Sequence, residues 1–124
     1  MPAFEHLLRS CDVSDMLDEI ASADPAAYLR RCFAEGCSAP ALSFARVQEL
    51  ALCAMVLDAI VNDRNYEGLE TELLDDWRMH LRPACAHLRE LAQSALERAL
   101  ATLGSQEPEA AAELEELTRR VAPA

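Results

Sequence analysis

Apolar residues recur at intervals of three and four along most of the chain, which is the spacing of one face of an α-helix. No stretch alternates polar and apolar residues as a half-buried strand does. Six proline and three glycine residues supply breaks between the periodic segments. The pattern predicts an all-α fold, a single compact antiparallel bundle of five or six helices.

The first two helices are predicted from an apolar stripe and from capping residues. The stripe predicts a helix over residues 3–22; the alternative is that Asp12 and Ser14 end one short helix and cap another. Asp24 followed by Pro25 is a typical helix start, because Asp accepts the free amide protons of the first turn and Pro fits the first helical position. The second helix is expected to end at Gly36, because glycine readily adopts the left-handed conformation that closes helices.

The third predicted helix is the most apolar one. Residues 37–42 form a connector, and Ser43 caps a helix that runs to about Val61. Its apolar positions cover more than one stripe of the helix surface, which places it at the centre of the core. So much apolar surface also indicates that a monomer leaves part of it uncovered, and that a homodimer or another bound protein covers it.

Three further helices are predicted in the C-terminal half. The fourth begins at Tyr66 and is interrupted by Pro83, since proline restricts the residue before it and kinks or breaks a helix. The fifth spans Pro83 to Leu103, and Pro108 opens a last amphipathic helix. We expect helices three to five to form the core.

Length and charge set the size of the fold and the classes of partner. The chain has 124 residues, which suffices for one core, so residues 1–124 are predicted to be one domain. With 22 acidic and 11 basic residues, the net charge is -11. Such a surface repels phosphates and anionic lipids, so neither nucleic acid nor a membrane is an expected partner.

The N-terminus and the cysteines indicate the compartment. The opening Met-Pro-Ala-Phe-Glu-His has neither the basic nor the apolar region of a signal peptide, so we expect a cytoplasmic protein. Five cysteines, an odd number without a secretion signal, indicate reduced thiols. All the basic residues are arginine, which is typical of a GC-rich coding sequence and indicates a bacterial or viral origin.

Cysteine and histidine side chains are the residue types that bind zinc, and five of them raise the question of a metal site. They are Cys32, Cys37, Cys85, His80 and His87. Cys85 and His87 are two apart, so on a helix they point to different sides and do not share an ion. We therefore predict no metal and no cofactor, and expect buried thiols and surface imidazoles.

One motif indicates a different class of function. Arg82 and His87 form an R-x-x-x-x-H sequence, which resembles the signature of the HEPN ribonucleases, small all-helical bundles that act as dimers. The resemblance implies that His87 acts as acid or base in RNA cleavage and that Arg82 stabilises the phosphate. The chain has Pro83 and Arg89 where that family has a polar and an aromatic residue. An RNA-cleaving enzyme is the alternative interpretation.

The favoured interpretation is a protein without catalytic residues that binds another protein as a chaperone, an inhibitor or a regulatory adaptor. Acidic residues crowd the first and fourth predicted helices, which favours docking to a basic partner. The residues predicted to contact the partner are Tyr66, Glu70, Trp77, Asp12 and Asp15. For Trp77, core packing is the favoured role and interface anchoring the alternative.

Overall fold

The chain folds as the all-α bundle that the apolar spacing predicts. The computed structural model describes residues 6–8, 13–22, 24–62, 64, 71–104 and 106–122. Within these ranges there is no strand, and there are six α-helices and a short 3-10 helix: α1 (Val13–Ser22), α2 (Pro25–Ser38), α3 (Phe44–Val61), α4 (Thr71–Leu81), η1 (Arg82–Ala84), α5 (Cys85–Leu103) and α6 (Pro108–Val121).

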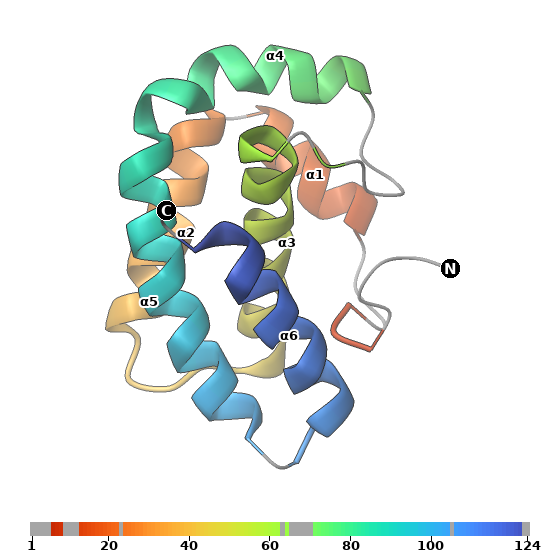
Figure 1. Cartoon of the computed structure of the whole chain (residues 1–124), viewed down its shortest axis with the longest axis vertical. Coiled ribbons are helices and arrows are strands. Elements are labelled where there is room, and N and C mark those ends of the chain that lie inside the picture. Colours follow the sequence, from red (N-terminus) through yellow and green to blue (C-terminus); the bar gives the residue numbers. More distant parts are fainter. Residues whose placement is uncertain are drawn as a thin grey trace.

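The centre of the bundle is α3, which contacts every other α-helix (Figure 1). Every residue from Leu50 to Ile60 is buried, so neighbours cover all sides of this helix. The predicted central position of α3 is therefore confirmed. From Leu50 to Ile60 the apolar surface of α3 that a dimer was expected to cover is covered by other helices of the same chain.

The core is built by α2, α3, α5 and α6 rather than by the third to fifth helices. Along its length α5 packs against α2, α3 and α6, whereas α4 lies across one end of the bundle (Figure 1). From α4, the Trp77 and Leu81 side chains enter the core, where they are 1% and 0% exposed. The other described side chains of α4, at positions 75, 76, 78 and 79, are polar or exposed.

The predicted N-terminal caps of α2 and α3 are confirmed. Asp24 Oδ1 accepts a hydrogen bond from the Ala26 backbone N–H at 3.0 Å. Ser43 Oγ accepts one from the Arg46 N–H at 3.1 Å. Each cap satisfies an amide that has no carbonyl partner within its helix.

Two predicted helix starts lie at or beside residues that the structure does not describe. The first helix, expected over residues 3–22, is described as α1 from Val13 to Ser22, and residues 6–8 form a turn. The fourth, expected from Tyr66, is described as α4 from Thr71 to Leu81, so its start at Tyr66 stays a prediction. Tyr66 lies outside the described residues.

Gly36 does not end its helix, contrary to the prediction, because α2 continues to Ser38. A Cβ atom at Gly36 would lie 2.8 Å from a methyl carbon of Leu50 and 3.2 Å from the Cβ of Ala95. The glycine therefore permits a close approach of α2 to α3 and α5. The left-handed end appears instead at Gly104, which has φ 50° and follows the last residue of α5 as predicted.

Two arginines of α5 bind the C-terminal ends of neighbouring helices. Arg98 Nη1 donates to the carbonyl of Gly36 at 2.6 Å, and Nη2 donates to that of Ala39. Arg89 Nε donates to the carbonyl of Val121 at 3.3 Å. The last carbonyls of a helix have no partner within it and carry partial negative charge, so guanidinium groups stabilise them.

A buried carboxylate connects α3 to α6. Asp58 is 0% exposed, and it accepts hydrogen bonds from Asn62 Nδ2 at 2.6 Å and from Arg64 Nε at 2.9 Å. The Asn62 amide also donates to the carbonyl of Arg120 at 2.9 Å. The carboxylate thus holds the end of α3, the residues after it and the end of α6 together.

Gly36→Ala should lower the free energy of unfolding by about 1 kcal/mol, measured by urea denaturation. Overpacking typically costs about 1–3 kcal/mol, which exceeds the gain of about 1 kcal/mol that alanine brings in helix propensity. Ala34→Gly, at an exposed position of the same helix, is the matched control and should cost only the propensity difference. A Gly36→Ala protein more stable than the wild type would contradict the close approach.

Candidate functional site

The residues predicted to contact a partner are in different surroundings. Trp77 is 1% exposed and packs inside its own chain. Core packing, the favoured role, is therefore confirmed, and the alternative of an interface anchor is wrong. Asp15 is exposed on α1. Asp12, Tyr66 and Glu70 lie outside the described residues.

The outer side of α4 and η1 carries a candidate binding surface. We call it the α4–η1 face and define it by five exposed residues, Asp75, Asp76, Met79, Arg82 and Pro83. Met79 is 80% exposed, and in the part of the chain that the structure describes it is the one large apolar side chain left on the surface. Sequence analysis missed it because a methionine beside core positions reads as a core residue.

Helix geometry explains why this face is exposed. Trp77 and Leu81 are four residues apart and lie on one side of α4, which packs on the bundle. Met79 is two residues from each, about 200° away around the helix, so it faces solvent. At the end of α4, Pro83 lacks an N–H and restricts Arg82, and the chain turns through η1 into α5.

The α4–η1 face includes a hollow and charges of both signs. A hollow of about 410 Å³ is lined by Arg78, Met79, Arg82 and Pro83. Arg78 Nη1 pairs with Asp75 Oδ1 at 2.7 Å. The side chains of Asp76 and Arg82 make no hydrogen bond or ion pair with any residue that the structure describes. An apolar hollow beside such groups suits a partner side chain that is apolar and flanked by charge.

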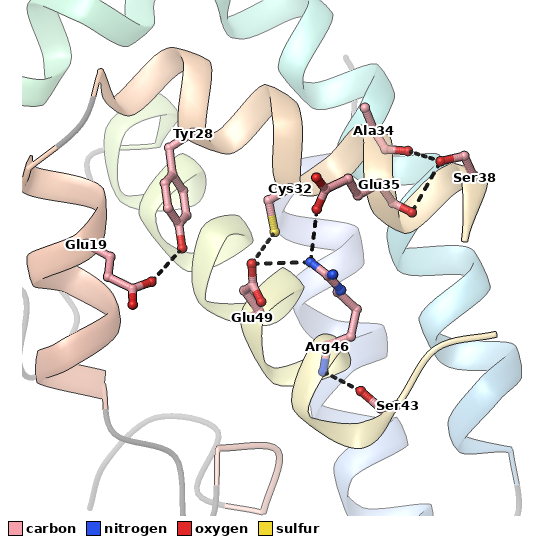
Figure 2. Close-up of polar contacts among 9 residues, drawn as sticks. All are labelled: Glu19, Tyr28, Cys32, Ala34, Glu35, Ser38, Ser43, Arg46 and Glu49. Carbon is pink, nitrogen blue, oxygen red and sulfur yellow. Dashed lines mark hydrogen bonds and ion pairs between the residues drawn. The ribbon is translucent and has the colours of Figure 1, made fainter. Parts of the chain in front are cut away.

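Three thiols have environments that favour the protonated form, and the fourth described thiol, Cys32, makes a hydrogen bond to a carboxylate. Cys32 Sγ donates to Glu49 Oε1 at 3.6 Å (Figure 2). A hydrogen bond with Cys32 and burial raise the pKa of the Cys53 thiol well above its ordinary value. Burial also raises the pKa of Cys37 and of Cys85. Because the thiolate is the nucleophile, the raised pKa values of Cys37, Cys53 and Cys85 disfavour the reactive form of these three thiols.

The described residues considered as metal ligands contact different groups. Cys32 faces α3, Cys37 Sγ donates to a backbone carbonyl of α5, and Cys85 Sγ donates to a carbonyl one turn earlier. His87 is exposed, and the side chain of His80 lies outside the described part of the chain. Among the described residues, no group of three or more His, Cys, Asp or Glu side chains is arranged to hold a metal ion.

Arg82 and His87, the pair that resembles the ribonuclease signature, are both exposed. Arg82 belongs to η1 and His87 to α5, and no hydrogen bond or ion pair joins these two described side chains. His87 is not among the residues that line the hollow beside Arg82. Their role in RNA cleavage stays a prediction.

Several acidic side chains of α1, α2 and α3 are engaged within the chain, as Figure 2 shows. The Tyr28 hydroxyl donates to Glu19 Oε2 at 3.2 Å. Arg46 Nη1 lies 3.1 Å from Glu35 Oε2 and 3.5 Å from Glu49 Oε1. These contacts hold the three helices together and neutralise part of the acidic surface that the composition predicts.

Comparison of the chain with protein family models, with curated proteins and with solved structures finds no match. Within the described ranges, none of the helices combines the length and the hydropathy needed to cross a bilayer. A functional conclusion therefore depends on the surface and chemistry of the chain itself.

Stability should fall as the pH rises above about 9, and Cys53 should account for part of the loss. The pKa of Cys53 in the folded protein lies above its ordinary value of 9.0. The folded state therefore holds this proton more tightly, so the stabilisation is complete below pH 9.0 and is lost progressively above it. Burial raises the pKa of Tyr28 as well, so it contributes in the same direction.

Urea unfolding at pH 7 and pH 10 measures this loss. Cys53→Ala lowers stability at both pH values by leaving a small cavity. The quantity compared is therefore the decrease in the free energy of unfolding from pH 7 to pH 10. That drop should be smaller in Cys53→Ala than in the wild type. An equal drop in the two proteins would show that Cys53 does not contribute.

Proposed function

We propose that this chain is a small cytoplasmic protein without catalytic activity that works by binding another protein, as a chaperone, an inhibitor or a regulatory adaptor. The observation that carries the proposal is the α4–η1 face, where Met79 stands 80% exposed beside a hollow. Burial of a methionine side chain is worth about 1.5–3 kcal/mol, so covering this residue favours association.

The composition of the α4–η1 face supports a protein partner. Interface anchors are apolar or arginine side chains set among polar neighbours, and Met79 and Arg82 combine these types. Methionine is flexible and adapts to irregular partner surfaces. The face is also rigidly supported from behind, because Trp77 and Leu81 fix α4 to the core.

Net charge supports a partner with a basic surface elsewhere in the contact. The chain has a net charge of -11, and Asp15, Asp18 and Glu19 are exposed along α1. Such a field accelerates encounter with a basic protein and opposes binding to the phosphates of a nucleic acid.

Affinity capture from the native host tests the proposal, with Met79→Glu compared against the wild type. The wild type should retain a partner protein in stoichiometric amount. Met79→Glu should retain at most about one tenth of that amount, because burial of the Met79 side chain is replaced by burial of a charge. Ala112→Glu adds the same charge at an exposed position of α6 and should bind normally. Equal retention by both variants would contradict a role for Met79.

A further inference from the structure

The charges of the α4–η1 face are arranged symmetrically about Met79. Asp76 lies three residues before Met79 and Arg82 three residues after it, and both are exposed. Asp76 lies within about 60° of Met79 around the axis of α4, and Arg82, the first residue of η1, lines the same hollow as Met79, so the three belong to one stripe. The order along the stripe is negative, apolar, positive.

A stripe with this order is complementary to itself. A two-fold axis through Met79 sets a second α4 antiparallel to the first, and a position k residues after Met79 then faces the position k residues before it. Arg82 of one copy thereby faces Asp76 of the other, and the same pair forms again on the opposite side of the axis. Met79 packs against Met79 at the centre.

Neighbouring residues favour the same arrangement. The guanidinium of Arg78 is paired with Asp75 in its own chain, so these two add little net charge to the contact. Pro83 and the hollow provide apolar surface into which a flexible methionine side chain of the second copy fits. The α4 helix lies along the outer edge of the bundle, where another copy has access to it (Figure 1).

Charge also favours association through this face. Two chains of net charge -11 repel each other, so association is least costly where an arginine that has no partner among the described residues meets a carboxylate. Each exposed ion pair contributes modestly, but like charges placed opposite each other remove that contribution and add repulsion.

From this placement we infer that the α4–η1 face binds a second copy of the chain, in a two-fold dimer with Met79 at the axis and two Arg82–Asp76 pairs across it. The inference rests on the proposed function and assigns one partner to its binding surface. The helix has 11 residues, about 17 Å in length, so its face is smaller than the roughly 800 Å² per partner of a stable interface. The dimer is therefore weak, with a Kd in the micromolar range or higher.

Sedimentation equilibrium of the full-length protein, from micromolar to millimolar concentration at physiological salt, tests the dimer with two charge reversals. In the proposed dimer, position 82 of one copy faces position 76 of the other. Arg82→Asp therefore places two aspartates opposite each other, and Asp76→Arg places two arginines opposite each other. Each variant alone should dimerise about tenfold more weakly than the wild type, or weaker still. Asp76→Arg moves the net charge toward zero, so a weaker dimer there cannot arise from general repulsion.

An equimolar mixture of the two variants distinguishes this geometry from others. In the mixed dimer the two introduced side chains, one basic and one acidic, face each other on one side of the axis. The native Arg82 and Asp76 side chains face each other on the other side, so the mixture should dimerise as the wild type does. The double variant Asp76→Arg/Arg82→Asp should also recover. Arg30→Asp, at an exposed arginine of α2, should leave the dimer unchanged.

A wild-type protein that stays monomeric up to millimolar concentration would overturn the inference, as would a dimer that neither reversal weakens or that the mixture does not restore. All substituted side chains are exposed, and circular dichroism verifies that each variant is folded. These results are separate from the capture experiment, because a monomer that still retains another protein through Met79 supports the proposed function and excludes only the second copy.

Discussion

The complete burial of α3 is the constraint on which the rest of this structure depends. From Leu50 to Ile60 every residue of the helix is buried, so every other helix must place part of its apolar surface against it. The apolar content of the chain is largely used in this enclosure. Surface apolar residues are correspondingly scarce, which is why a single exposed methionine in the described part of the chain is informative.

Enclosing one helix on all sides brings helices close together and buries polar groups, and particular residues make both possible. Gly36 removes a side chain where α2 meets α3 and α5. Asp58 places a charge inside the apolar helix, and it is tolerated because Asn62 and Arg64 donate hydrogen bonds to it. Arg98 of α5 binds the end of α2, so α5 both buries apolar surface and donates hydrogen bonds to carbonyls that have no partner within α2.

The same enclosure separates the interior of the protein from its outer surface. Cys53 is buried in the interior, where a hydrogen bond with Cys32 and burial raise the pKa of its thiol. Among its described side chains, α4 places Trp77 and Leu81 in the core, and with η1 it presents Met79 and Arg82 to solvent on the outer side. This arrangement supports the proposal that the chain acts through contacts between protein surfaces, and the order of charges around Met79 supports the proposed two-fold contact.

Local sequence determined most of the secondary structure. Helix periodicity, the caps at Asp24 and Ser43 and the interruption at Pro83 act over a few neighbouring residues, so they are readable without a fold. Tertiary structure alone decided that Gly36 is a packing contact rather than a helix end and that no other described helix covers Met79, which helical spacing places opposite Trp77 and Leu81. Both outcomes depend on which helices are neighbours in the fold. The neighbours are set by the packing of residues distant in sequence against α3.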